Sequence, residues 1–486
     1  MTPTVITNAR RLDPSIELNE NCDLLIEGGV VSRIGVVGAH QDWAETVEAR
    51  VLAPEPGTEL VVTPGLVDLH VHVFGGVGVP NVDDIGVRSA VPVVVDAGSA
   101  GTATIDDFVA LQAERSSTQV LNFLSIESGG IVEGDAGHNT SSSPTRMCTP
   151  SMDDFLATIE RHGRRIVGLK VWATTAAGLP WLQHATTLSE LIERPLMVHV
   201  GEPRHDESTA AVSGNVLDHL GGGDIVTHCF TAQPGAIIDA DGKIASEVVA
   251  ARDRGVRFDV APGLVNLSFD RAVRAMEQGW LPDILSTDLN RFCLEHPVRS
   301  LVNVLSAFMA LGLTLEQVVE RATTRPATAI GAPIGHPDTG QVATLSLLTL
   351  RSAASIFSDG SGGTVSGTER LEPYGCFIEG VYHEAGPPKA AVPVVDLDVN
   401  TSVAAFLREV ERELTYFAAR QRRWRGPDLH NLVHEVRINH EIPIAIGLEA
   451  LHTTLSVDDR LTPAGWLLES LGPVESIERL ATSLSS

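Results

Sequence analysis

Thr63-Pro-Gly-Leu-Val-Asp-Leu-His-Val-His72 is the most informative segment of the chain. Apolar residues at 67, 69 and 71 alternate in it with polar residues at 68, 70 and 72. A β-strand turns successive side chains to opposite faces, so we expect His70 and His72 to share one face and the apolar residues to pack on the other. Two imidazoles at i and i+2, at the end of a buried strand, are well placed to hold one metal ion. The alternative is an amphipathic strand with two solvated histidines, and further ligands along the chain must decide.

Short apolar runs alternate with helix-like segments, such as 152–162 and 245–254, from residue 66 onward. The eight runs are 66–74, 91–97, 120–126, 166–172, 196–200, 224–229, 256–261 and 283–287. Runs rich in Val, Ile and Leu are typical of parallel strands covered on both faces. Eight such units predict an α/β fold, a (β/α)8 TIM-like barrel, whose chemistry sits at the C-terminal strand ends. An open doubly wound sheet is the alternative, but no Gly-x-Gly-x-x-Gly dinucleotide loop is present.

The barrel prediction covers residues 63–339 and leaves flanking segments of different character. Residues 1–62 read as short strands, with a hairpin around Gly28-Gly29, and residues 340–395 return to β-like runs that could complete a sheet with them. Residues 396–486 are predicted to be a mainly helical C-terminal extension. Apolar residues recur there at helical spacing, at positions 403, 406, 407, 410, 414 and 417. Such a stripe needs a covering surface, for which we expect another subunit of a homo-oligomer or the outside of the barrel.

Composition narrows the possible partners of the chain. Its 486 residues include 35 Lys and Arg against 62 Asp and Glu, a net charge of −27, which argues against nucleic acid or an anionic membrane as partner. Five scattered cysteines without a Cys-x-x-Cys pair fit reduced thiols. The N-terminus has no apolar signal region, and no apolar run approaches the ~18 residues of a membrane span. We therefore expect a cytoplasmic protein that acts on a small molecule.

Four further strand ends offer groups compatible with a metal: Lys170, His199, His228 and Asp288. Each has an ordinary interpretation by itself, because a histidine in an apolar run is often a hydrogen-bonded core residue and an aspartate after a strand is often a helix N-cap. The ordinary interpretations are less convincing for all four residues together, because a barrel brings all the strand ends to one rim. The strand ends therefore supply the partners that the two histidines of the opening stretch require.

The lysine looks out of place in such a group, because an ammonium repels metal ions and is costly to bury. Burial, however, lowers the pKa of a lysine and favours the neutral amine, which can add carbon dioxide to give an anionic carbamate. A carbamate has two oxygens and can bridge two metal ions. Two divalent ions ~3.5–4 Å apart would activate a shared water and polarise a carbonyl.

Six segments carry a family resemblance: Pro64–His72, Gly168-Leu-Lys170, His199, His228, Ser286-Thr-Asp288 and the helical stretch Leu311–Ala327. Together they resemble the amidohydrolase superfamily in its binuclear, carboxylated-lysine form. Within it the chain most resembles the amidohydrolase/deacetylase branch, beside dihydroorotases and hydantoinases, over roughly residues 1–390. The flanking β runs resemble the small β-sandwich domain that this family builds from both chain ends.

The resemblance implies two divalent metal ions, zinc being expected, and a role for each ligand. The implied set is His70, His72 and Asp288 on the more buried ion, His199 and His228 on the more exposed ion, and Lys170 bridging both as a carbamate. Asp288 would also act as the general base and acid, taking the proton from the bridging hydroxide and delivering it to the leaving amine. The implied reaction is hydrolysis of an amide, cyclic amide or ester bond.

Other positions depart from the family pattern or are candidate substrate contacts. Dihydroorotases usually follow the paired histidines with an arginine motif, which is absent here, so that activity is not expected. Relatives in the deacetylase branch often have a histidine where this chain has Asn290, and Glu127 is unusual at the mouth of the third strand. Arg204 and Arg291 are candidates to hold a substrate carboxylate, with surface salt bridges as the alternative.

Two other functions stay open from the sequence. A mononuclear deaminase on the same barrel would typically lack the lysine of the fourth strand, so Lys170 argues against it. A non-catalytic scaffold related to the hydantoinases would have lost ligands, whereas this chain retains all six. The metal content of the purified protein distinguishes the scaffold from the hydrolase.

Overall fold

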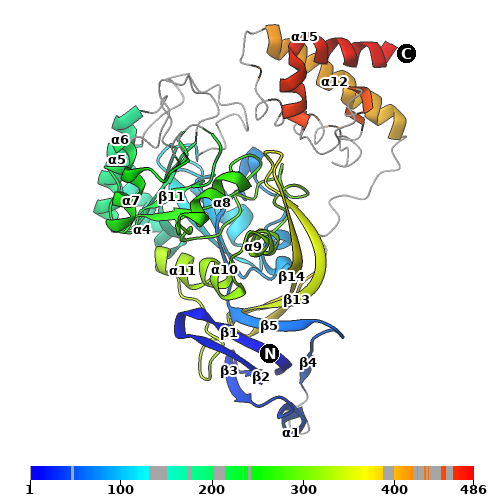
Figure 1. The fold of residues 1–486 in the computed structure, drawn as a ribbon. Coiled ribbons are helices and arrows are strands. Elements are labelled where there is room, and N and C mark those ends of the chain that lie inside the picture. The colour runs from blue at the N-terminus through cyan, green and yellow to red at the C-terminus, as the bar shows by residue number, and fades with distance from the viewer. Residues whose placement is uncertain are drawn as a thin grey trace.

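The chain forms two sheets and a C-terminal group of helices, as Figure 1 shows. The structure, a computed structural model, describes residues 2–44, 49–130, 150–172, 178–201, 214–233, 235–238, 242–386, 399–419 and 464–485, with 424, 429, 432, 433, 436, 440, 450, 451 and 453–455. Of the candidate residues named above, Arg204 lies outside these ranges.

Seven consecutive strands form one parallel sheet in sequence order. They are β6 (Val67–Val71), β7 (Val93–Ala97), β8 (Gln119–Ser125), β9 (Ile166–Trp172), β10 (Leu196–His199), β11 (Ile225–Thr227) and β12 (Arg257–Asp259). The eighth predicted run is not a regular strand. It makes two isolated parallel bridges instead, between Asp259 and Ile284 on the β12 side and between Val71 and Leu289 on the β6 side. One segment is thus bridged to both edge strands of a mixed α/β fold.

Helices connect these strands and cover the sheet (Figure 1). They are α2 (Val82–Ile85), α3 (Ile105–Phe108), α4 (Met152–His162), α5 (Gly178–Ile192), α6 (Gly214–Leu217), α7 (Ser246–Asp253), α8 (Phe269–Glu277), α9 (Leu301–Ala310), α10 (Leu315–Ala322) and α11 (Thr324–Ile330). The predicted helix at 152–162 is confirmed with both its bounds. Ser151 caps it in a capping box with Asp154, which satisfies backbone groups that a helix start leaves unpaired.

Two hydrophobic clusters divide the faces of the parallel sheet. An inner cluster joins residues of β6 to β11 with Ile284 and with α11, and a larger outer cluster lies under the covering helices. The strict alternation expected for β6 is wrong. Val67 and Leu69 belong to the inner cluster, whereas Val71 belongs to the outer one. The pairing of β6 with β7 shifts register between Asp68 and Val71, and such an irregularity reverses which face the following side chains occupy.

The second sheet combines strands from both sides of the parallel sheet in the sequence. Its members are β1 (Thr4–Asp13), β2 (Leu18–Glu27), β3 (Val30–Gly35), β4 (Arg50–Leu52), β5 (Glu59–Pro64), β13 (Leu345–Ser358), β14 (Thr364–Ile378) and β15 (Val381–Glu384), with the short α1 (His40–Ala44) after β3. The predicted hairpin turns at Gly28-Gly29, where both φ angles are positive, as a tight turn requires. The strands hydrogen-bond as one continuous eight-stranded sheet, with β13 pairing antiparallel to β5.

The C-terminal extension has a hydrophobic core of its own. Helix α12 (Val399–Ala419) packs against α15 (Ala464–Ser485), and the apolar stripe of α12 is buried in a cluster with residues such as Leu451 and Leu468 of the same extension. The expectation that this stripe needs another subunit or the barrel is therefore wrong, because segments later in the chain cover it.

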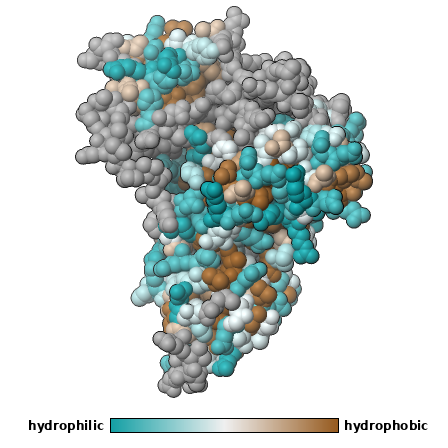
Figure 2. All heavy atoms as spheres, turned by 180° about the vertical axis from the view of Figure 1, so that it is seen from behind, coloured by the Kyte–Doolittle hydropathy of each residue, from teal (hydrophilic) through white to brown (hydrophobic). Residues whose placement is uncertain are grey.

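The surface of the described residues is mixed in polarity. On the face in Figure 2, hydrophobic residues form several separate groups among hydrophilic ones, which is ordinary for a folded chain. The helices within the described ranges include none with the length and apolar character that crossing a membrane requires. The four described cysteines, at positions 22, 229, 293 and 376, are all free and buried.

Candidate metal centre

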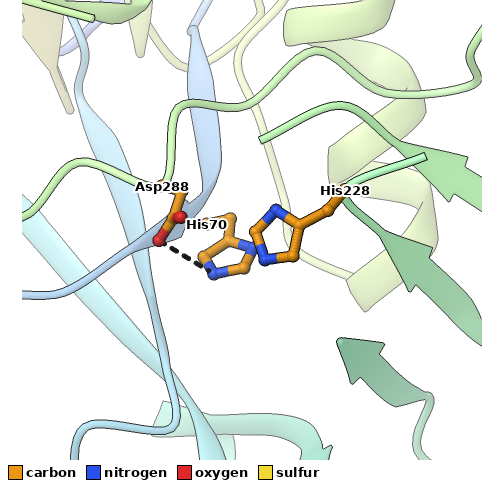
Figure 3. Close-up of side chains that lie close together, drawn as sticks. All are labelled: His70, His228 and Asp288. Atoms are coloured by element: carbon orange, nitrogen blue, oxygen red, sulfur yellow. Dashed lines mark ion pairs between the residues drawn. The ribbon is translucent and has the colours of Figure 1, made fainter. Parts of the chain in front are cut away.

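Three buried side chains converge at the C-terminal ends of the parallel strands. Ligand atoms of His70, His228 and Asp288 all lie within 4.8 Å of one another, and Figure 3 shows their side chains facing a common point. Asp288 Oδ1 is 3.4 Å from His70 Nε2 and 3.1 Å from His72 Nε2. Two imidazoles and a carboxylate that share one small space are a donor set suited to a divalent transition metal.

Lys170 and His199 complete the group. Lys170 Nζ lies 3.4 Å from His70 Nε2, and the rings of His199 and His228 have centroids 4.4 Å apart. Lys170 lies two residues before the end of β9, and His199 is the last residue of β10, so both come from the C-terminal halves of their parallel strands. The structure thus brings together all six side chains that the sequence suggested as ligands.

Backbone hydrogen bonds fix Asp288 beside the paired histidines. The Asp288 N–H donates to His70 O at 2.7 Å, and the His72 N–H donates to Leu289 O at 2.7 Å. Thr287, next to Asp288, donates both its backbone N–H and its hydroxyl to Asp68. Asp288 is not a helix N-cap, because the next helix begins only at Leu301. Its position follows instead from pairing with the β6 segment.

The second oxygen of Asp288 has its own partner. Asn266 Nδ2 donates to Asp288 Oδ2 at 3.0 Å. Gly263, with φ of +50°, lies directly beneath, where an added Cβ would be 2.1 Å from Asp288 Oδ2. The loop after β12 therefore holds this carboxylate through a close backbone approach that only glycine permits.

The hairpin of β13 and β14 makes hydrogen bonds and close contacts to the loop after β12. Asp359, at the tip between β13 and β14, accepts from the Phe269 N–H at 2.8 Å through Oδ2 and from the Ser361 N–H at 2.8 Å through Oδ1. Ser361 Oγ donates to Leu267 O at 3.0 Å. Gly360 packs so tightly on Leu264 O that a Cβ there would approach it to 2.2 Å. The Gly-rich stretch 358–364 is thus an ordered support for the metal centre rather than a loose connection.

Each histidine of the centre uses one ring nitrogen for a protein partner. The pairs are His70 Nδ1 with Thr227 Oγ1 at 2.8 Å, His72 Nδ1 with Ser99 Oγ at 3.0 Å, His228 Nδ1 with Ala261 O at 2.8 Å, and His199 Nε2 with Gly201 O at 3.0 Å. A carbonyl oxygen only accepts, so the paired nitrogens of His228 and His199 carry the proton. Their other nitrogens retain a lone pair for a metal ion.

Burial sets the charge states of the cluster. Desolvation, followed by the positive charge of Lys170, lowers the pKa of His199 to about 3. Desolvation and neighbouring positive groups also lower the pKa of His70 and of His228 well below the usual range. Desolvation lowers the pKa of Lys170 to about 8, although nearby carboxylates oppose that shift. Neutral imidazoles and an accessible neutral amine are the forms that metal binding and carbamate formation require.

The candidate substrate contacts occupy different settings. Glu127 follows β8 and is half-buried, and burial raises the pKa of its carboxyl. Asn290 Nδ2 donates to the backbone oxygen of Asp288 at 3.1 Å, so its side chain supports the turn after the last ligand. The Arg291 guanidinium lies 5.2 Å from the ring centroid of Phe292. Their substrate roles stay predictions.

Several residues of the centre were not identified from the sequence. Thr227 immediately precedes the ligand candidate His228, and Asp259 is the one charged side chain in the buried run Phe258–Ala261. A charge inside an apolar run is a signal that a polar network exists nearby. Asn266 and Gly263 gave no comparable signal, because their importance depends on how the loop folds back onto Asp288.

Comparisons with known proteins agree with this site. The model of the amidohydrolase family matches residues 61–369. A deacetylase from Brucella anthropi is 31% identical over 377 residues, which is 76% of this chain and 89% of that protein. A deacetylase from Agrobacterium fabrum is 32% identical over 317 residues, 64% of this chain and 75% of its own.

A solved dihydroorotase structure superposes with a TM-score of 0.68 at 28% identity, over 80% of this chain and 100% of that chain. The fold is accordingly TIM-barrel-like, and the predicted resemblance to metal-dependent hydrolases of C–N bonds, near the deacetylase and dihydroorotase branches, is confirmed. The chain belongs to the amidohydrolase family.

Proposed function

We propose that this chain is a metal-dependent hydrolase that adds water across an amide, cyclic amide or ester bond of a small molecule. One observation carries the proposal: His70, His228 and Asp288 place their ligand atoms within 4.8 Å of one another in a buried site. Membership of the amidohydrolase family and the similarity to proteins named deacetylases support the same chemistry.

The residues present fit a pair of divalent ions, zinc being our expectation. The histidines have one ring nitrogen each satisfied by the protein, which leaves the other for a metal ion. His70, His72 and Asp288 would hold one ion and His199 with His228 the other. Divalent ions bound there would lower the pKa of a water molecule and polarise the substrate carbonyl.

Lys170 would bridge the two ions as a carbamate. Its neutral nitrogen attacks the carbon of carbon dioxide, an N–C bond forms, and one proton leaves to solvent, so the product is an anion. A pKa of about 8 makes the neutral amine accessible near pH 7. The carbamate is an anion, and two divalent ions bound beside it would stabilise its negative charge.

Asp288 would serve as general base and then general acid. It accepts a proton as the water oxygen attacks the carbonyl carbon, and it delivers that proton to the leaving nitrogen or oxygen as the scissile bond breaks. The products are a carboxylic acid and an amine or alcohol, which stay in one molecule when the substrate is cyclic. Asn266, hydrogen-bonded to Oδ2, would keep the carboxylate oriented for both transfers.

The architecture supports a division of the chain into three parts. We infer a complete (β/α)8 barrel over residues 63–339, with the segment bridged to β12 and β6 in the eighth position. Residues 1–62 and 340–395 would form the small β domain, and residues 396–486 the helical extension. We expect the enzyme to be cytoplasmic and to form a homo-oligomer.

Metal analysis and a substrate screen test the proposal together. We expect the purified chain to contain two divalent ions and to hydrolyse at least one member of a panel of N-acyl amino acids, cyclic imides, hydantoins and lactones. Chelation should abolish turnover, and added zinc should restore it. Turnover by a metal-free protein would contradict the proposal. Release of ammonia as the only nitrogen product from an amino-substituted ring would favour the deaminase. A protein that binds metal but turns over no substrate would favour a scaffold.

A further inference from the structure

A hydroxyl stands between a ligand histidine and a buried carboxylate. His70 Nδ1 lies 2.8 Å from Thr227 Oγ1, and Thr227 Oγ1 lies 2.8 Å from Asp259 Oδ2. The direct separation of His70 Nδ1 from Asp259 Oδ2 is 3.7 Å, which is too long for a hydrogen bond. All three residues are at most 1% exposed, so solvent does not supply alternative partners.

The chemistry of these groups fixes the direction of the chain of hydrogen bonds. A carboxylate only accepts, so the single hydroxyl proton of Thr227 goes to Asp259. The Thr227 oxygen then offers a lone pair, and His70 must donate from Nδ1. His70 is therefore held as the tautomer whose Nε2 lone pair faces Lys170 Nζ and Asp288 Oδ1.

The sheet itself places the two supporting residues. Thr227 of β11 and Asp259 of β12 are direct partners in the parallel register. Ser286 Oγ donates to the other carboxylate oxygen, Asp259 Oδ1, at 2.7 Å. Hydroxyl groups from two neighbouring segments thus hold both oxygens of Asp259, which leaves it little freedom to rotate.

We propose that Thr227 and Asp259 are positioning residues, which lock the tautomer and ring orientation of His70 through this hydroxyl relay and so strengthen its hold on a divalent ion. The inference rests on the metal centre proposed above. Histidine ligands generally donate a hydrogen bond from their second ring nitrogen to an acceptor, which makes the metal-binding nitrogen more basic. Loss of that acceptor typically weakens metal binding about 10–100-fold. Here the carboxylate is out of reach, and Thr227 spans the gap.

A matched pair of substitutions tests the relay. Thr227→Val keeps the branched shape and removes the hydroxyl, whereas Thr227→Ser keeps the hydroxyl. Both full-length variants would be stripped with a chelator and titrated with zinc against a chromophoric competitor. We expect zinc affinity to fall about 10–100-fold in Thr227→Val and to stay near that of the wild type in Thr227→Ser. Long-range 1H–15N spectra of histidine-labelled metal-free protein should show His70 with its proton on Nδ1 in the wild type and a mixture of tautomers in Thr227→Val.

Each outcome of this experiment decides something definite. Unchanged zinc affinity and an unchanged His70 tautomer in Thr227→Val would overturn the relay. Asp259→Asn keeps the shape of the side chain but removes the charge and turns one accepting oxygen into a donating NH2. It provides the second variant if Thr227→Val does not fold, and it should also bind zinc more weakly; wild-type affinity would overturn the role of Asp259. A wild-type protein that binds no zinc or other divalent ion would defeat the metal centre itself, a failure distinct from that of the relay.

Discussion

Asn266 donates its side-chain amide to Asp288 Oδ2 over 3.0 Å, so the two oxygens of this carboxylate have different neighbours. The other oxygen, Oδ1, faces the ring nitrogens of His70 and His72. One oxygen is thereby directed to the metal ligands and the other is held from the loop after β12. This asymmetry is what a residue requires if it binds a metal ion and also transfers a proton.

Asn266→Ala should lower kcat while leaving the metal content unchanged. The lost hydrogen bond frees the carboxylate to rotate, and misplacement of a catalytic group by about 1 Å costs up to about 100-fold in rate. Steady-state kinetics with metal analysis would measure the effect. Asn303→Ala is the matched control, since that amide donates to Val298 O in the described structure, away from the centre. Equal kcat values in the two variants would contradict the assigned role.

Asp288→Asn should reduce kcat by about 10²–10⁴-fold, because the amide keeps the shape of the side chain but cannot accept the proton of the attacking water. KM should change less than kcat, since Asp288 contacts the metal ligands rather than the distal groups of a substrate. Kinetics and metal analysis of the same preparation would separate the two effects. Normal turnover with both ions bound would show that another group is the base.

Lys170→Ala should lose metal ions and activity together, and short carboxylic acids should restore part of both, because an added carboxylate can replace the carbamate. Lys243→Ala is the control, since Lys243 is exposed on the surface. Intact-mass and crystallographic analysis of the active wild type should show the added carboxylate on Lys170. An unmodified lysine in an active protein loaded with metal would refute the carbamate.

Asp23 should make the stability of the N-terminal sheet depend on acid. Burial alone would raise its pKa, but the backbone N–H groups of Asn8, Gly38 and His40 and the ring of His40 donate to it, and the pKa falls below its usual 3.8. A carboxyl with a lowered folded-state pKa stabilises the fold above pH ~4, and this stabilisation disappears as pH falls through the folded pKa. Asp23→Asn should therefore melt below the wild type at pH 7, and the difference should shrink toward pH 3. A difference that is constant with pH would contradict this account.

Removal of the C-terminal extension after residue 386 should leave the metal centre intact. Among the described residues, the hydrophobic cluster of the extension shares no member with the cluster under the helices of the parallel sheet, so we expect the site to keep its packing without the extension. We expect metal content and kcat to persist, as measured by metal analysis and steady-state kinetics, and light scattering would record whether the assembly changes. A truncated protein that keeps its assembly but loses only its chemistry would show that the extension takes part in catalysis.

The strand ends and their reactive groups could be predicted from the amino-acid sequence. Alternating apolar runs and intervening helical segments located all seven regular parallel strands and the helix Met152–His162. Because parallel strands bring their carboxyl ends to one edge, His70, Lys170, His199 and His228 could be assigned to a common site before any contact was known. The residue types indicated a metal centre, and the resemblance to the amidohydrolase superfamily then implied a metal-dependent hydrolase.

The contacts that hold the site in place could be identified only in the folded structure. The register shift in β6 reversed the face of Val71 and Val73, and no periodic pattern records where a bulge falls. The support of Asp288 by Asn266, and of their loop by Asp359, depends on close approaches between segments far apart in the chain. The same holds for the relay from His70 through Thr227 to Asp259, because hydrogen bonds act over about 3 Å in space and leave no fixed spacing in sequence.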